Sequence, residues 1–530
     1  MRVLRRTLGA LLALGLAPAL LTACAAARGD DARPGDDPPA ALAPFDRLLP
    51  APVSARAEGP GYTLGPGTVI RTGPGPGEEV RRVGELLAEQ LRGPSGLPLP
   101  VVDGAQGDGI RLRIDRDSEG VGDEGYRLES RPGGITLTAR TPAGLFHAGQ
   151  TLRQLLPRSG PGAVPGGTVT DRPRFAYRGA MIDIARHHFT VEQVMRYVDQ
   201  LAQYKVNALH VHLTDDQGWR LAVDSWPRLA EYGGGTEVGG GPGGYWTKDD
   251  YRRLVAHAAE RYVDVVPEID MPGHVNAALA SYPELTCDGK APERYTGIKV
   301  GFSSLCVGKE RTYEFVDDVL GELAALTPGR YLHIGGDEAH QTPAADYAAF
   351  MDRAQAVVGR HGKTVVAWHQ LASARPAPGA VIQYWGHDRT PAAEKAAVSA
   401  AAAAGHRLIL SPADRLYLDM KYDAATKPGL AWAGYVPVKR AYSWDPGAYL
   451  AGVPESAVLG VEAPLWTETV ATRGDWELMA FPRVLGLAEL GWSPAGALDW
   501  ASYSRRLAAQ GPRLDAQGIA YHKAPDVPWS

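Results

Sequence analysis

The chain has 530 residues, of which 45% are hydrophobic and 22% are charged, so it is long enough for one large and one smaller globular domain. Its formal net charge is -5. This balance excludes a broad basic surface for nucleic acid and a polybasic membrane patch, so we expect a partner that carries little charge.

The first residues have the pattern of an export signal. Arginines precede an apolar run from Leu8 to Leu20, which is too short to remain as a membrane span. The next residues, Leu21-Thr22-Ala23-Cys24, resemble the bacterial lipobox, in which cleavage leaves the cysteine as an acylated first residue. The resemblance implies a signal peptide over residues 1–24, with Cys24 as a lipid anchor on the outer face of the cell membrane. An ordinary secretory cleavage nearby, with Cys24 discarded, is the alternative.

Two segments separate this signal from the largest part of the chain. Residues 25–45 are rich in Pro and Asp, which is typical of a disordered tether. Residues 46–170 predict a small α+β domain with a largely antiparallel sheet. Apolar residues recur at helical spacing from Val80 to Leu91, strand-like alternation occurs at 110–114, and a helix is expected over 142–156. No cluster of acids, histidines or cysteines indicates chemistry in this domain.

From residue 171 to residue 530, short β-rich runs alternate with amphipathic stretches, which predicts a (β/α)8 barrel of the TIM type. Parallel strands need helical crossovers, and an eighth strand closes the sheet. The predicted strands are 179–184, 208–213, 264–269, 331–334, 364–367, 381–384, 407–410 and 458–461.

A polar or aromatic residue follows every predicted strand. Loops at the C-terminal ends of barrel strands build the active sites of such proteins. An N-cap aspartate or a core tryptophan explains any single case, but the whole set at one end of a barrel indicates a site. In chain order the residues are Arg186; Asp215 and Asp216; Asp270 and His274; Asp337 and Glu338; Trp368; Trp385; Tyr417 and Asp419; and Trp466 and Glu468.

The acids, the arginine and the tryptophans of this set suggest a carbohydrate site. Tryptophan faces stack on pyranose rings, and carboxylates accept hydrogen bonds from hydroxyl groups. Cleavage of a glycoside needs a proton donor for the leaving oxygen and a negative group beside the oxocarbenium-like transition state. Asp337 and Glu338 can supply both.

These two acids lie side by side in "LHIGGDEAH", residues 332–340. Beyond the end of a strand the backbone can turn both side chains toward the barrel mouth, and Gly335 and Gly336 permit that turn. Two carboxylates so close do not both ionise easily. We therefore expect one of them to have a raised pKa and to keep its proton near neutral pH, while the other stays charged.

The stretches "MIDIARHHF", "HLTDDQGWR", "EIDMPGHV", "HIGGDEAH", "QYWG" and "PLWTE" together resemble glycoside hydrolase family 20, the β-N-acetylhexosaminidases. The resemblance extends from the mid-forties to the end of the chain. It implies an exo-acting hydrolase that removes terminal β-linked GlcNAc or GalNAc from the non-reducing ends of oligosaccharides. It also implies a retaining mechanism without an enzyme nucleophile, in which the 2-acetamido oxygen of the substrate attacks the anomeric carbon and forms an oxazolinium intermediate.

The resemblance implies a role for each residue of the site. Glu338 is the general acid and then the base, Asp337 orients the acetamido N–H, and Tyr417 binds the acetamido carbonyl oxygen. His274 lies between Asp215 and Glu338 and tunes the proton affinity of the acid; a packed histidine that caps a loop is the alternative. Trp368, Trp385 and Trp466 would enclose the acetyl group and the sugar ring, and Arg186, Asp419 and Glu468 would bind the hydroxyl groups of the terminal sugar. Trp432 would stack on the sugar on the leaving-group side, for which packing of a surface loop is the alternative.

Each alternative function of the chain would require different residues. His210 and His212 share a strand face and could bind a metal, but no further ligands are indicated, so we expect neither metal nor cofactor. A sugar-binding protein that has lost catalysis should lack Asp337, Glu338 or Tyr417, and all three are present. Within enzymes, an inverting or nucleophile-using glycosidase is the second interpretation, and it would also cleave a sugar without the acetamido group.

Two further cysteines occur, Cys287 and Cys306. In an exported chain a remaining pair at short spacing predicts a disulfide, which contributes about 3 kcal/mol by loop entropy. The alternative is two buried free thiols, which are less common outside the cytoplasm.

Overall fold

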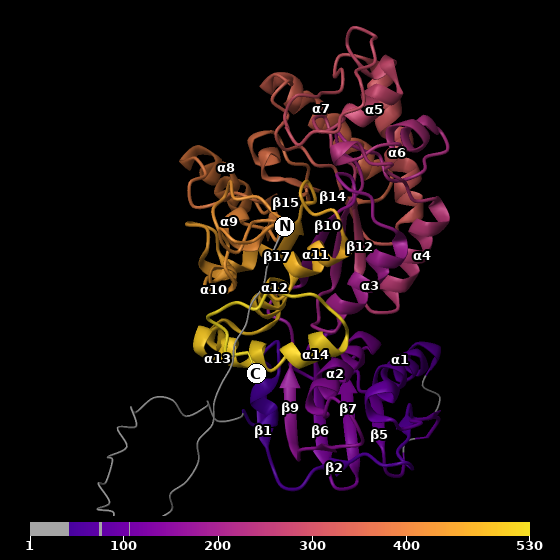
Figure 1. The fold of residues 1–530 in the computed structure, drawn as a ribbon, viewed down its shortest axis with the longest axis vertical. Coiled ribbons are helices and arrows are strands. Elements are labelled where there is room, and N and C mark those ends of the chain that lie inside the picture. Colours follow the sequence, from indigo (N-terminus) through magenta and orange to yellow (C-terminus); the bar gives the residue numbers. More distant parts are fainter. Residues whose placement is uncertain (1–41, 74–76, 105, 530) are drawn as a thin grey trace, which may run out of the picture. The chain divides into compact units, whose positions relative to one another are not determined.

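The computed structural model describes residues 42–73, 77–104 and 106–529 (Figure 1). The predicted signal peptide with Cys24 and most of the predicted tether lie outside this range. The 3-10 helix η1 (Pro44–Arg47) buries Phe45, at the end of the predicted tether. Among the described residues no helix combines the length and the apolar character that a membrane span needs.

The small domain contains a seven-stranded mixed sheet. Its order is β1 (Ser54–Ala57), β9 (Gly167–Asp171), β6 (Tyr126–Arg131), β7 (Gly134–Ala139), β5 (Ile110–Ile114), β3 (Ile70–Arg71) and β4 (Val101–Val102), and β2 (Tyr62–Thr63) and β8 (Ala163–Val164) form a separate pair. From β1 to β7 the pairing is antiparallel, as expected. From β7 to β4 it is parallel, because connections such as helix α1 (Gly77–Ser95) return the chain in the same direction.

Helices α1 and α2 (Pro142–Leu155) pack together and cover this sheet (Figure 1). The apolar residues at helical spacing between Val80 and Leu91 are buried, as the pattern predicts. Helix α2 begins after Thr141, whose hydroxyl oxygen accepts a hydrogen bond from the Gly144 amide.

The rest of the fold is a closed barrel of parallel strands, which confirms the predicted fold class. The strands are β10 (Tyr177–Asp183), β11 (Ala208–His212), β12 (Asp264–Glu268), β13 (Tyr331–His333), β14 (Thr364–Trp368), β15 (Val381–Tyr384), β16 (Arg407–Leu410) and β17 (Val458–Leu465). Each corresponds to one predicted strand and differs from it only at the ends. β17 shows the largest difference, because it continues to Leu465.

Helices connect the strands on the outside of the barrel, and the last four α-helices follow the final strand, β17. The helices are α3 (Val191–Ala202), α4 (Lys248–Ala259), α5 (Asn276–Ser281), α6 (Glu310–Leu326), α7 (Ala344–Arg360), α8 (Ala392–Ala403), α9 (Ala413–Leu416), α10 (Val438–Tyr442), α11 (Arg473–Ala480), α12 (Arg483–Trp492), α13 (Trp500–Ala508) and α14 (Gly511–Ala516). Between β14 and β15 the connection contains the 3-10 helix η5 (His369–Ser373).

Helix α3 shows how the sequence specifies these crossovers. Thr190 and Gln193 form a capping box, in which each side chain accepts a hydrogen bond from the other residue's amide. Val194, Val198 and Leu201 follow at helical spacing and are buried. The cap therefore fixes the start of the helix, and the apolar stripe fixes the face that packs on the barrel.

Asp171, the last residue of β9, ties the small domain to the barrel. Its buried carboxylate accepts hydrogen bonds from Lys205 Nζ at 2.9 Å, from the Tyr126 hydroxyl at 2.8 Å and from Trp492 Nε1 at 2.9 Å. Lys205 lies between α3 and β11, and Trp492 ends α12. Burial lowers the pKa of Lys205, and the charge of Asp171 opposes this effect. A buried ion pair thus joins the two domains.

Replacement of Lys205 by Met should leave Asp171 as a buried charge without its cation. We expect the free energy of unfolding, measured by urea denaturation, to fall by about 3–5 kcal/mol. Exposed Lys427 is the control, and Lys427→Met should change stability by less than about 0.5 kcal/mol. Equal stability of the two variants would show that the Asp171 pair does not join the domains.

Candidate active site

The predicted site residues meet at the C-terminal ends of the barrel strands, because all eight strands run in the same direction. Trp368 ends β14, and Tyr417 directly follows the short helix α9. Trp432 lies between α9 and α10 and is 43% exposed, whereas Trp368 is fully buried. The set therefore extends from the interior of the barrel to its rim.

A sharp backbone turn after β13 presents Asp337 and Glu338. The backbone is in the left-handed region at Gly335 (φ 62°), at Gly336 (φ 98°) and at Glu338 (φ 43°). A Cβ atom at Gly335 would lie 1.7 Å from Oδ1 of Asp270, which also accepts a hydrogen bond from the Gly336 amide at 3.0 Å. Glycine is therefore required at Gly335 for the turn to pass this close to the carboxylate.

His274 stands opposite both acids. Its Nε2 lies 3.5 Å from Glu338 Oε2 and 3.9 Å from Asp337 Oδ2, and its Nδ1 lies 3.1 Å from Asp215 Oδ1. Burial lowers the pKa of His274, but the charges of Asp215, Asp337 and Asp270 outweigh it and raise the pKa well above its ordinary value. An imidazolium therefore faces Asp337 and Glu338 and offsets their mutual repulsion.

The acids around this imidazolium have displaced pKa values. Burial raises the pKa of Asp337; the positive charge of His274 opposes this increase and the charge of Glu338 adds to it. Burial, followed by the charge of Asp337, raises the pKa of Asp270 well above its ordinary value. The side chain of Asp337 is 12% exposed and that of Glu338 is 29% exposed. Asp337 is thus the deeper acid and Glu338 the more accessible one.

Arg186, Asp419 and Glu468 leave buried polar atoms unpaired within the described part of the chain. Arg186 Nε, both carboxylate oxygens of Asp419 and Glu468 Oε2 have no hydrogen-bond partner there. Burial and then the charge of Glu468 raise the pKa of Asp419 well above its ordinary value. Unpaired buried polar groups are costly and cluster at functional sites. Their donors and acceptors suit the hydroxyl groups of a sugar.

Aromatic rings enclose the space beside these groups. The ring centroids of Trp368 and Trp466 are 5.8 Å apart, and those of Tyr417 and Trp466 are 6.1 Å apart. Trp432 continues the wall to the rim, 6.0 Å from Trp385 and 5.9 Å from Tyr417. Buried apolar walls with a few polar groups at one end are typical of a small-ligand site.

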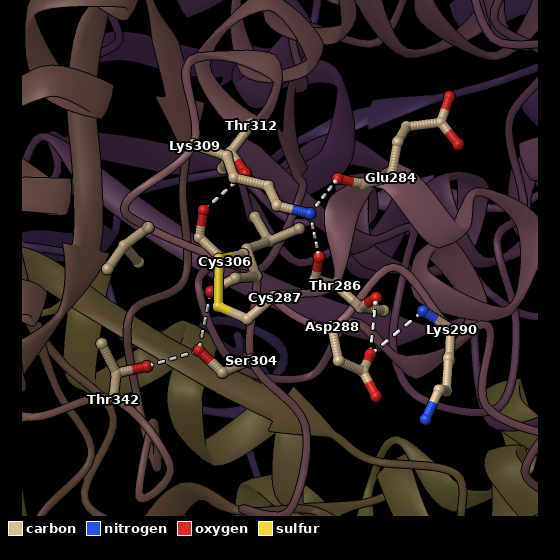
Figure 2. Close-up of a disulfide and its surroundings, with 12 residues drawn as sticks. Glu284, Thr286, Cys287, Asp288, Lys290, Ser304, Cys306, Lys309, Thr312 and Thr342 are labelled. Carbon is tan, nitrogen blue, oxygen red and sulfur yellow. Dashed lines mark hydrogen bonds between the residues drawn. A yellow bond between two sulfur atoms is a disulfide. The ribbon is translucent and has the colours of Figure 1, made fainter.

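A disulfide between Cys287 and Cys306 closes a loop beside the site (Figure 2). Figure 2 shows a hydrogen bond between the hydroxyl groups of Ser304 and Thr342. The two hydroxyl oxygens lie 2.7 Å apart, and Thr342 belongs to the segment that follows Glu338. In the same loop the Ser303 hydroxyl donates to Asp216 Oδ1 and accepts from the Val275 amide. The loop thus contacts the segments that carry Glu338 and His274.

Comparisons with known proteins decide the family. The model of "Glycosyl hydrolase family 20, catalytic domain" matches residues 175–495, and that of "Glycosyl hydrolase family 20, domain 2" matches residues 46–172. The chain belongs to glycosyl hydrolase family 20. Among curated family 20 relatives, a Beta-N-acetylhexosaminidase of Cellulomonas fimi is 43% identical over 487 residues, which is 91% of this chain and 97% of that protein.

Solved family 20 structures have the same fold. The GH20 beta-N-acetylhexosaminidase from Streptomyces coelicolor A3(2) superposes with a TM-score of 0.90 at 60% identity, covering 92% of this chain and 99% of that one. A GH20 exo beta-N-acetylglucosaminidase from Vibrio harveyi, solved with N-acetylglucosamine, has a TM-score of 0.80 at 30% identity, covering 93% and 80%.

Histidines and acids inside this family 20 barrel lie close enough to hold a metal ion. Ligand atoms of His210, Glu268 and His333 lie within 4.8 Å of one another. Burial lowers the pKa of His210, but the charges of Glu462 and Glu268 raise it to about 9. A protonated ring has no lone pair for a metal, so the arrangement favours ion pairs.

The sequence did not point to Glu268, and it indicated Asp270, the acid that touches Gly335, only as one of the residues that follow a strand. Both belong to the stretch "EIDMPGHV", and residues two apart on a strand face the same side. That spacing was the available signal, because it places both acids inside the barrel. The contacts that give them a role come from β11 and β13, far away in the sequence.

Gly335→Ala should displace the turn, because the new Cβ would overlap Asp270 Oδ1. We expect kcat for the 4-nitrophenyl N-acetyl-β-glucosaminide to fall by about 100-fold, as for a misplacement of about 1 Å in a catalytic site. Gly362 is the matched control, since it has φ 73° and a Cβ atom added to it would have no neighbour within 4 Å. Gly362→Ala should lose stability but keep kcat; similar kcat values in the two variants would contradict the role of the turn.

Proposed function

We infer that the protein is an exo-acting β-N-acetylhexosaminidase. It hydrolyses terminal β-linked GlcNAc or GalNAc residues at the non-reducing ends of oligosaccharides by retaining, substrate-assisted catalysis. The observation that carries this conclusion is the pair Asp337 and Glu338, which reach the same imidazole nitrogen of His274 from one turn. Two acids on one turn suit a proton donor and an orienting group, with the acetamido oxygen of the substrate as the nucleophile.

Glu338 is the group that we propose as general acid and then general base. It protonates the glycosidic oxygen as that bond breaks, and it later takes a proton from the water that opens the oxazolinium ring. Its side chain is more exposed than that of Asp337, which suits access to the leaving group and to water. The imidazolium of His274 lies beside it and favours the carboxylate that remains after proton transfer.

Asp337 is proposed to accept a hydrogen bond from the acetamido N–H. Positive charge develops on this group as the oxazolinium forms, and a buried carboxylate stabilises it strongly. The raised pKa of Asp337, caused by burial and opposed by His274, makes its ionisation costly. A developing positive charge beside it lowers that cost, so the interaction strengthens toward the transition state.

Tyr417 and the tryptophans are proposed to hold the acetyl group. Burial raises the pKa of Tyr417 well above its ordinary value, so the phenol keeps its proton and can donate to the acetamido carbonyl oxygen. Trp368 and Trp466 wall the methyl group and the ring. Arg186, Asp419 and Glu468 bind the hydroxyl groups of the terminal sugar, which suits an exo-acting enzyme. Trp432 supports the sugar on the leaving side.

Two substrates and one variant test this function. The wild type should release 4-nitrophenol from the N-acetyl-β-glucosaminide and leave the plain β-glucoside almost uncleaved, because the glucoside has no acetamido nucleophile. Glu338→Gln should lower kcat on the first substrate by about 100-fold or more. Equal rates on both sugars would indicate an enzyme nucleophile. Binding of GlcNAc without cleavage of either substrate would indicate a sugar-binding protein.

We also propose that the protein is exported and anchored through Cys24. The support is the arginine-led apolar run and the lipobox-like residues that end at this cysteine. Mass spectrometry of the mature protein should find Cys24 as an acylated first residue, and Cys24→Ala should abolish the modification. An unmodified N-terminus at another residue would contradict the anchor.

A further inference from the structure

Glu268 occupies the centre of a buried polar layer beneath the active site. It is the last residue of β12, and it pairs in register with His212 at the end of β11 and with His333 at the end of β13. All three side chains are fully buried. Because they come from adjacent strand ends, their side chains meet inside the barrel.

The two oxygens of Glu268 have different partners. Oε2 contacts Nδ1 of His212 and lies 3.1 Å from Nε2 of His210. Oε1 accepts a hydrogen bond from Nε1 of Trp368 at 2.8 Å and lies 2.9 Å from Nδ1 of His333. One oxygen thus holds histidines of β11, and the other holds the indole that forms a wall of the proposed acetamido site.

From His212 a chain of contacts leads to the proposed acid. Nε2 of His212 lies 2.8 Å from Asp215 Oδ2. Asp215 Oδ1 lies 3.1 Å from Nδ1 of His274, whose Nε2 lies 3.5 Å from Glu338 Oε2. Carboxylates and imidazoles alternate along the whole chain from Glu268 to Glu338.

The charges along this chain support one another. Burial raises the pKa of Glu268, but His333, His212 and His210 outweigh it and hold the pKa well below its ordinary value. Burial lowers the pKa of His333 itself, so the positive charge comes from His212 and His210, whose pKa values are raised. Burial lowers the pKa of His212, and the charge of Glu268 with the hydrogen bond to Asp215 outweighs it, so the pKa is raised well above its ordinary value. From Glu268 to His274, negative and positive groups therefore alternate, and each keeps its neighbour ionised.

We propose that Glu268 is a positioning residue that couples recognition of the acetamido group to proton donation. Through His212 and Asp215 it fixes His274 against Glu338, and through its other oxygen it fixes the indole of Trp368. This proposal rests on the function proposed above. Glu268 acts only through other residues, because it lies beneath the site and its oxygens are fully engaged.

Other titratable groups also act on this series of contacts from Glu268 to Glu338, and a change of pH can alter their charges as well. The groups whose charges act on Glu268 or His212 are His210 on β11, His333 on β13, Asp270 and Asp337 on the strand-end loops, Asp183 on β10 and Asp215 after β11. Among them Glu268 is the carboxylate that contacts both His212 and Trp368.

Glu462, on β17, provides a matched control in the same layer. It is fully buried, lies 2.8 Å from Nδ1 of His210 and accepts a hydrogen bond from Gln383 at 2.6 Å. It also accepts a hydrogen bond from the Tyr177 hydroxyl. The structure shows no bond from Glu462 to His212 or Trp368, so its loss should cost stability without disturbing the chain to Glu338.

The experiment compares Glu268→Gln with Glu462→Gln in the full-length enzyme. We expect Glu268→Gln to lower kcat on the GlcNAc β-1,4-linked dimer by about 100-fold, and by only about 10-fold on the 4-nitrophenyl glycoside, whose leaving group needs less protonation. Loss of the negative charge of Glu268 lowers the pKa of His212, so His212 loses its proton, and with it its hold on Asp215 and His274, at a lower pH. The alkaline limb of the kcat/KM profile should therefore move to lower pH, whereas Glu462→Gln should keep both kcat values and the profile of the wild type.

A second pair of variants keeps the proposal testable if Glu268→Gln does not fold. His212→Asn retains a donor toward Glu268 but is too short to reach Asp215, so it should reproduce the larger loss of kcat on the GlcNAc dimer. In a double-mutant cycle, Trp368→Phe and Glu268→Gln should be non-additive, because both break the same indole bond.

Equal losses of kcat in Glu268→Gln and Glu462→Gln on both substrates, with unchanged pH profiles, would overturn the proposal and leave Glu268 as a packing residue. Additive effects of Trp368→Phe and Glu268→Gln on kcat would show that Glu268 does not position the indole of Trp368. A wild type that fails to cleave the N-acetyl-β-glucosaminide would instead contradict the proposed function itself.

Discussion

The structure depends most on how the barrel pairs the charges that it buries at the C-terminal ends of its strands. Asp215 and Glu268 are almost fully buried, and each is surrounded by positive groups. Arg186, His212 and His274 supply those charges to Asp215, at 2.7, 2.8 and 3.1 Å. A buried charge that loses its partner costs several kcal/mol, so these groups form one electrostatic unit rather than a set of independent contacts.

Much of this arrangement could be predicted from the sequence, because it follows from local patterns. Short β-rich runs and amphipathic stretches identified the barrel strands, and the residues after each strand identified the site. In the small domain the sequence did not indicate strands β3 and β4, because each is only two residues long and carries no alternating pattern. The residues that follow the strands indicate the site because parallel strands place all their C-terminal ends on one face of the barrel.

The ionisation states could not be predicted in the same way. The sequence shows that Asp337 and Glu338 are adjacent, so it predicts that their pKa values differ, but it does not show which acid is deeper. Burial raises the pKa values of both Asp337 and Asp270; the charge of Glu338 adds to the increase at Asp337, and the charge of Asp337 adds to the increase at Asp270. Only the turn at Gly335 brings these groups together. Nor does the sequence show that Glu268 contacts several buried side chains, because its partners come from three other strands.

The cost of ionising Asp337 bears directly on why the substrate can supply its own nucleophile. A nucleophilic carboxylate must be charged before the reaction starts, and burial beside Glu338 opposes that charge on Asp337. An orienting carboxylate has no such need, because the acetamido group becomes positive as its oxygen attacks the anomeric carbon. The buried environment therefore favours the ion pair between Asp337 and the acetamido group only once the positive charge has developed. Interactions that are stronger in the transition state than in the ground state accelerate a reaction.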